Sequence, residues 1–137
     1  MIVLDTNVLS EPLRRRPSPV VIDWLASLRE PAAISAVTVA ELLRGARLLP
    51  DGRRRDELVA GIEATVRAFR HDVLPFDERS ARAYAELNEH RSRVGRPLSV
   101  EDGMIAATCL TFGATLATRN VLDFEGLRID VVDPWLG

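Results

Sequence analysis

The sequence predicts a single α/β domain, a three-layer α/β/α sandwich with a mostly parallel sheet of about five strands. Short apolar or β-branched runs alternate along the chain with segments of helical periodicity. No two runs are joined by a two-residue hairpin turn, so each strand is expected to return through a helix and lie parallel to its neighbour. The 137 residues, 47% of them hydrophobic, suit one compact domain (1–137) that needs no disulfide or structural metal.

The first half of the chain predicts two strands and four helices. Residues 2–4 are a short β-branched run, and the polar cluster after it opens a short helix through Leu13. Apolar residues between 20 and 28 fall on one face of a second helix. The next strand is expected at 32–35. Thr38 then opens a third helix, and apolar spacing over 58–69 predicts the fourth.

The second half predicts three strands and two helices. Residues 73–76 suit an edge strand, because Pro75 lacks the N–H that an inner strand needs. Asp77 is expected to cap the following helix, and Ser99 to begin another that ends at Gly113. The last two strands are expected at 114–117 and 129–132.

Composition and the amino-terminal sequence exclude several classes of protein. No run of about 18 apolar residues predicts a membrane span. The chain reaches Asp5 without the basic start and apolar core of a secretory signal, so a cytoplasmic protein is expected. The single cysteine, Cys109, lies on an apolar helix face and is expected to be a buried thiol in a reducing compartment.

The basic residues have an unusual composition. All 18 are arginine, none is lysine, and the net charge is −2, which does not suit a strongly basic nucleic-acid binder. Local arginine runs suit either phosphate contact or solvated helix ends and loops. These runs are Arg14–Arg16, Arg53–Arg55, and Arg91 with Arg93 and Arg96.

Four acids stand near the expected carboxyl ends of strands. Asp5 follows the first strand, and Asp123 follows the fourth. Glu41 and Asp102 are each expected in the first turn of a helix, after the second strand and before the fourth. Ligands of parallel sheets bind at this rim, where converging carboxylates repel one another unless they are protonated or bridged by cations. The pattern therefore predicts a site for a hard divalent cation such as Mg²⁺ or Mn²⁺.

A purely structural interpretation of the four acids stays open. Two of them end T-x-x-E and S-x-x-D patterns typical of capping boxes, and the other two suit turns or loop caps. The strand-end Asp5, followed by Thr6 and Asn7, together with acids at two helix starts, favours a site.

Several segments, taken in order, carry a family resemblance. They are 3–9 (VLDTNVL), 38–42 (TVAEL), 102–108 (DGMIAAT), 116–120 (LATRN) with Asp123-Phe124, and the ending Asp133-Pro134-Trp135. From Ile2 to Trp135 the chain resembles the PIN-domain ribonucleases, most of all the VapC toxins of bacterial toxin–antitoxin pairs in their FitB-like branch. The resemblance implies a PIN-like fold and a Mg²⁺- or Mn²⁺-dependent endoribonuclease.

The resemblance also implies roles for individual residues. The metal is expected on Asp5 and Asp102, with Glu41 and a fourth acid completing the cluster. Many family members carry an acid directly after a Thr-Arg pair, where this chain has Asn120. The fourth position therefore falls to Asn120 or to Asp123, of which only Asp123 offers a charged oxygen. Thr6, Asn7 and Arg119 are expected to orient the acids or to meet phosphate.

The partners expected by resemblance are a small antitoxin, an RNA substrate, operator DNA reached only through the antitoxin, and a second copy of the chain. No membrane partner is expected. Two alternatives stay open. One is a non-catalytic partner in an antitoxin–DNA repressor complex. The other is a haloacid-dehalogenase-like phosphatase, which pairs a strand-end Asp with an acid two residues later, where this chain has Asn7.

Overall fold

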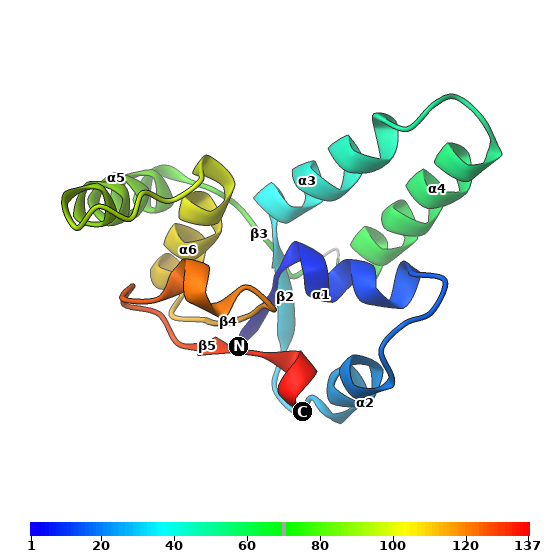
Figure 1. Ribbon diagram of the computed structural model, residues 1–137, viewed down its shortest axis with the longest axis horizontal. Helices are drawn as coiled ribbons and strands as arrows, with labels where there is room; N and C mark the ends of the chain where they lie inside the picture. Colours follow the sequence, from blue (N-terminus) through cyan, green and yellow to red (C-terminus); the bar gives the residue numbers. More distant parts are fainter. Residues whose placement is uncertain (70) are drawn as a thin grey trace.

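A five-stranded parallel sheet forms the centre of the molecule (Figure 1). The computed structural model describes residues 1–69 and 71–137. The strand order is β3-β2-β1-β4-β5, and every neighbouring pair is parallel, which confirms the predicted sheet. The strands are β1 (Ile2–Leu4), β2 (Ala32–Ser35), β3 (Val73–Leu74), β4 (Thr115–Ala117) and β5 (Val131–Val132).

Helices cover both faces of the sheet. Figure 1 shows α5 and α6 on one side and α1 to α4 on the other. The α-helices are α1 (Thr6–Ser10), α2 (Pro19–Ser27), α3 (Ala36–Arg47), α4 (Arg53–Ala68), α5 (Glu78–Arg93) and α6 (Val100–Phe112). The 3-10 helices are η1 (Glu11–Leu13), η2 (Val121–Phe124) and η3 (Pro134–Leu136). Within the described residues no helix has the length and apolar content to span a membrane.

The alternation of side chains along β1 divides the core in two. Val3 packs with buried residues of α6 such as Ile105, whereas Ile2 and Leu4 pack with residues of α1, α3 and α4. Strand residues that point to opposite faces each meet a helical layer, as a doubly covered parallel sheet requires. Cys109 is fully buried in the first of these two clusters, as predicted, and burial raises its pKa to about 12.

Most element boundaries agree with the sequence, and β3 lies at the sheet edge, as predicted from Pro75. The predicted start of the third helix is wrong. The helix α3 begins at Ala36, and the Ser35 hydroxyl caps it by accepting a hydrogen bond from the Val37 N–H at 3.0 Å. Glu41 therefore lies in the second turn of its helix and belongs to no capping box. The strands are also shorter than expected, because β3 ends at Leu74 and β5 holds only two residues.

The strand order places a switch point next to β1. The chain adds β2 and β3 on one side of β1, and β4 and β5 on the other. Residues of α1, which follows β1, and of η2, which follows β4, pack in the two different core clusters. In open parallel sheets the ligand-binding crevice lies beyond the carboxyl ends of two such strands. Register pairs Leu4 with Ala117, so the next residues, Asp5 and Thr118, are neighbours at this crevice.

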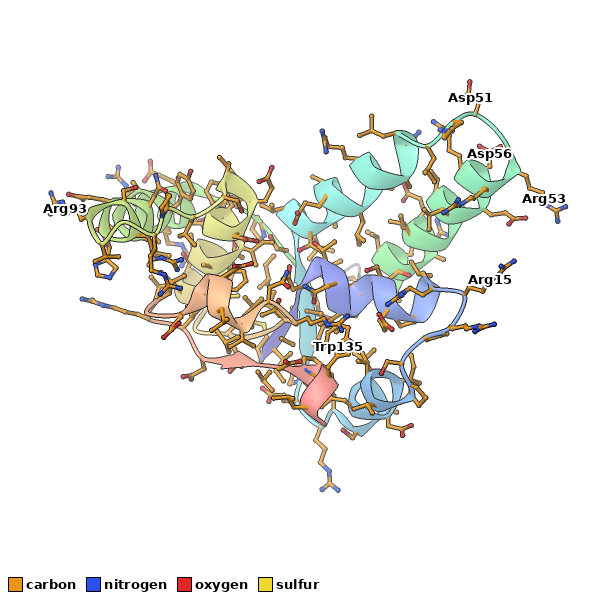
Figure 2. The ribbon with its side chains drawn as sticks, in the orientation of Figure 1. Arg15, Asp51, Arg53, Asp56, Arg93 and Trp135 are labelled. Carbon is orange, nitrogen blue, oxygen red and sulfur yellow. The ribbon has the colours of Figure 1, made fainter. Side chains whose placement is uncertain are left out.

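The arginine runs differ in their exposure. The first run and Arg53 are exposed, and Figure 2 shows Arg15 and Arg53 projecting away from the domain. Arg93 also extends from the tip of α5 (Figure 2). The interpretation of the third run as a solvated face is wrong for Arg91, whose side chain is buried with 5% relative exposure.

Candidate active site

Asp5 is buried at the point where β1 meets α1. Only 4% of the residue is exposed, and it is the N-cap of α1. Its Oδ1 accepts a hydrogen bond from the Thr6 N–H at 2.8 Å, and its Oδ2 accepts one from the Thr118 hydroxyl at 2.7 Å. Asp5 thus does cap a helix, as the structural interpretation proposed, while both of its oxygens are held in fixed directions.

Thr118 connects the ends of the two central strands. Its hydroxyl donates to Asp5 and accepts hydrogen bonds from the Asn7 side-chain amide at 3.3 Å and from the Asn120 N–H at 3.1 Å. The Asn7 Oδ1 in turn accepts from the Arg119 N–H at 3.1 Å. Sequence reasoning missed Thr118. Its position directly before the Arg-Asn pair was a signal, but its contact with Asp5 depends on strand register.

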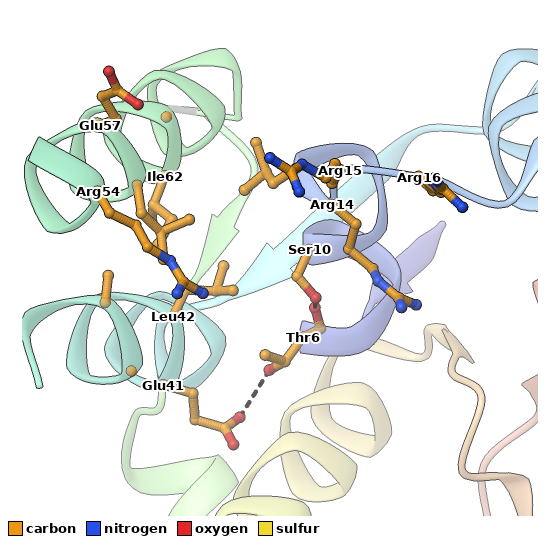
Figure 3. Close-up of a pocket in the computed structure, with 15 residues that line it drawn as sticks. Thr6, Ser10, Arg14, Arg15, Arg16, Glu41, Leu42, Arg54, Glu57 and Ile62 are labelled. Atoms are coloured by element: carbon orange, nitrogen blue, oxygen red, sulfur yellow. Dashed lines mark hydrogen bonds between the residues drawn. The ribbon is translucent and has the colours of Figure 1, made fainter. Parts of the chain in front are cut away.

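Glu41 joins the site through Thr6. The Thr6 hydroxyl donates to the Glu41 Oε1 at 3.0 Å (Figure 3), while the Thr6 N–H donates to Asp5. Thr6 therefore bonds to two of the predicted acids, one with its side chain and one with its backbone. A cavity of about 1160 Å³ adjoins Thr6 and Glu41 and is also lined by Arg14 and Arg54 (Figure 3).

Asp102 enters the crevice from the first turn of α6. The Ser99 hydroxyl accepts a hydrogen bond from the Asp102 N–H at 3.1 Å, so the cap predicted at Ser99 is confirmed. Gly103 lets this turn pack closely on α5, since a Cβ there would lie 2.7 Å from the Tyr84 ring. The half-buried Asp102 is therefore carried by a helix end with little freedom to move.

Four carboxylates at this end of the sheet interact through their charges, and we call them the acidic cluster: Asp5, Glu41, Asp102 and Asp123. Burial is the main reason that the pKa of each of the first three is raised. Neighbouring negative charges add to this effect. Asp123 raises the pKa of Asp5 and Asp102, and Asp5 and Asp102 both raise the pKa of Glu41. Hydrogen bonds from Thr118, Thr6 and Ser99 oppose these shifts in part.

The donor set of the acidic cluster suits a hard cation. All four side chains offer carboxylate oxygens, which hard divalent cations prefer. The raised pKa of Asp5, Glu41 and Asp102 reflects burial and neighbouring negative charge, both of which a bound cation would offset. Within residues 1–69 and 71–137, no group of three or more His, Cys, Asp or Glu side chains lies close enough to form a metal-binding set. The acids therefore interact through their charges without forming a closed coordination shell in the described residues.

Two further predicted residues lie at the edge of the site. The Arg119 guanidinium stacks over the Trp135 ring, 5.1 Å from its centroid. Among the described residues no ion pair joins Arg119 to the acidic cluster. Asn120 is exposed, and Asp123 lies three residues further on, in η2.

The fold and the site together define a PIN domain, and the family model described as PIN domain matches residues 2–124. The Toxin FitB of Neisseria gonorrhoeae is 41% identical over 98% of this chain and 99% of its own length. The Plasmid stability protein StbB of Pseudomonas syringae pv. tomato is 42% identical with the same coverage. The crystal structure of FitAcB from Neisseria gonorrhoeae superposes with a TM-score of 0.91, at 41% identity, over 98% of this chain and 99% of that one.

The chain belongs to the PIN-domain family, within the group of VapC and FitB toxins. This assignment confirms the family resemblance and the predicted fold. It leaves no support for the phosphatase alternative, which also lacks the second acid, because Asn7 stands in that place and its amide lies 3.5 Å from Asp5.

Proposed function

We propose that this protein is the toxin of a toxin–antitoxin pair and a divalent-metal-dependent endoribonuclease. The observation that carries the proposal is the acidic cluster at the switch point of the sheet. Relatives support it by name: the VapC ribonuclease Y4jK of Sinorhizobium fredii is 40% identical over 98% of this chain, and the tRNA(fMet)-specific endonuclease VapC of Shigella flexneri is 29% identical over 93%.

The metal site of this proposal consists of Asp5, Glu41, Asp102 and Asp123, which take Mg²⁺ or Mn²⁺. A bound divalent cation supplies an activated water and offsets charge at the scissile phosphate. The chain's own residues prepare that chemistry. Thr118 and the Thr6 N–H fix the two oxygens of Asp5, and the Thr6 hydroxyl holds the Oε1 of Glu41.

The substrate of the proposed reaction is a phosphodiester bond of RNA. Arg14 and Arg54 line the cavity beside Thr6 and Glu41, where guanidinium groups suit the phosphates of a polynucleotide backbone. Asn7 and Asn120 add polar groups next to Thr118, which directly follows β4. We assign these side chains to substrate positioning, and Arg119 to the edge of the same surface.

The partners of this proposal follow those of the relatives. The FitAB complex bound to an IR36 DNA fragment contains a chain 40% identical to this one, with a TM-score of 0.90. We therefore propose a small antitoxin partner, contact with operator DNA only through that antitoxin, a homodimeric toxin, and a cytoplasmic location. Repression of its own operon by the complex is compatible with catalysis by the free toxin.

Cleavage of total RNA by purified, antitoxin-free protein tests the proposed function. Fragments are expected with Mg²⁺ or Mn²⁺ and none with EDTA. In-line attack by water leaves 5′-phosphate and 3′-hydroxyl ends, and cyclic phosphate ends would contradict that mechanism. Protein that cleaves no RNA under any of these conditions, but binds operator DNA with an antitoxin, would support the non-catalytic alternative.

Replacing Thr118 by valine is expected to lower the cleavage rate about 10- to 100-fold, because Asp5 loses the hydroxyl that orients it. Thr118→Ser keeps a hydroxyl at this place and is expected to retain most of the activity. The measurement is kcat and KM on one RNA substrate for the three proteins. Equal activity of the valine and serine variants would show that the hydrogen bond to Asp5 does not matter for the reaction.

A further inference from the structure

Arg91 is an unusual residue of this fold, because its charged side chain is buried. It projects from α5 and has 5% relative exposure. Burying an uncompensated guanidinium costs several kcal/mol, so such a group must be satisfied by acceptors. No ion pair joins Arg91 to a carboxylate in the part of the chain that the structure describes. Its partners are backbone carbonyls instead.

These carbonyls belong to the segment that carries Asp123. The Arg91 Nη1 donates to the carbonyl of Asp123 at 2.9 Å and to that of Glu125 at 3.2 Å. The Arg91 Nε donates to the carbonyl of Arg96 at 2.7 Å, which holds the residues just after α5 against the same side chain. One guanidinium thus ties the end of α5 to η2.

Arg96 makes a second connection to the same segment. Its Nη2 donates to the Leu122 carbonyl at 3.1 Å, and its Nη1 lies 3.6 Å from a carboxylate oxygen of Glu125. We call Arg91 and Arg96 the arginine clamp. Together they donate to three carbonyls between residues 122 and 125, on both sides of the Asp123 side chain.

The segment held by the clamp needs external support. The 3-10 helix η2 has only four residues, and the side chain of its N-cap residue, Asn120, makes no capping hydrogen bond. Short 3-10 helices are weakly stabilised by their own hydrogen bonds. Phe124, with 1% relative exposure, fixes η2 to the core, and the clamp fixes its carbonyls. The exposed Asp123 is thereby directed from a rigid base, and its charge reaches both Asp5 and Asp102.

We propose that Arg91, assisted by Arg96, is a positioning residue that holds Asp123 in the acidic cluster. The inference rests on the proposed function in so far as the cluster binds a divalent cation. Arginine suits the role because its planar fork donates from Nε and Nη1 in fixed directions at once, which a lysine ammonium cannot reproduce.

The test is a double-mutant cycle between Arg91→Lys and Asp123→Asn, with Mn²⁺ affinity measured by calorimetry and RNA cleavage measured in parallel. In the parent chain, Arg91→Lys is expected to lower the Mn²⁺ affinity and the rate of RNA cleavage about 10- to 100-fold each. This is the usual effect of losing a residue that supports a metal ligand from behind. In the Asp123→Asn background it is expected to change Mn²⁺ affinity less than about twofold, because the group that it positions is already gone.

Arg93→Lys is the matched control, since Arg93 lies on the same helix, is exposed and pairs only with Glu89 among the described residues. It is expected to leave Mn²⁺ affinity and cleavage unchanged. If Arg91→Lys fails to fold, Arg96→Gln removes the contact with Leu122 from an exposed position and is expected to weaken Mn²⁺ binding severalfold in the parent chain only.

Two results would overturn the inference. One is that Arg91→Lys lowers the Mn²⁺ affinity equally in the parent chain and in the Asp123→Asn variant. An equal loss would indicate general destabilisation of the fold. The other is an Asp123→Asn variant that binds Mn²⁺ as well as the parent. Parent protein that binds Mn²⁺ but cleaves no RNA would contradict the proposed function and leave the role of the clamp intact.

Discussion

Asp5→Asn is expected to reduce RNA cleavage by about 10²- to 10³-fold, corresponding to the several kcal/mol of charge stabilisation that a metal site contributes. The substitution keeps the shape of the side chain and the oxygen that accepts from the Thr6 N–H. It removes a buried negative charge, and burial is the main reason that the pKa of the Asp5 carboxyl is raised. The folded state should therefore be as stable as the parent at neutral pH, or more stable.

Activity and stability are thus expected to move in different directions, and both are measured on the same preparations. Cleavage is followed with one RNA substrate, and unfolding is followed by circular dichroism. Asp23→Asn, a change of the same chemistry at an exposed position of α2, serves as the control and should behave like the parent. An Asp5→Asn protein that is folded and cleaves at the parent rate would refute a metal role for Asp5.

Much of the fold could be predicted because its elements are short and sharply bounded. The β-branched run at 2–4 marks a strand and the glycine at 113 marks a helix end by local chemistry, whereas Pro75 predicted the edge position of β3 but not its end at Leu74. The start of α3 could not be predicted in this way. Ser35 and Thr38 are both good N-cap residues, and the T-x-x-E pattern favoured Thr38. In the structure β2 runs directly into α3, so Ser35 ends the strand and caps the helix at once.

The candidate site divides into a part that sequence could predict and a part that depends on tertiary structure. The four acids could be singled out because each was expected to follow a strand or to lie near a helix start, and for Glu41 this expected position was one helical turn too early. The contact of Thr118 with Asp5 depends on the register that pairs Leu4 with Ala117, which no local pattern contains. The role of Arg91 depends on how η2 packs against α5, so its place in an arginine run predicted the wrong environment.

Divalent cations are expected to stabilise the protein more at pH 8 than at pH 5. Asp5, Glu41 and Asp102 have raised pKa values in the folded state, whereas the unfolded chain titrates at about 4. Their favourable contribution to folding is therefore complete below about pH 4 and is lost as the pH rises through the folded-state values. A cation offsets the charges that appear above those values, and it competes with protons below them.

At a cation concentration of about 100 times Kd, binding contributes about 2.7 kcal/mol, or roughly 10 °C in Tm for a domain of this size. Thermal unfolding with and without Mn²⁺ at pH 5, 6.5 and 8 measures the effect. The shift should grow with pH and shrink strongly in Asp5→Asn. A shift of the same size at every pH, or one unchanged in that variant, would mean that the cation binds outside the acidic cluster.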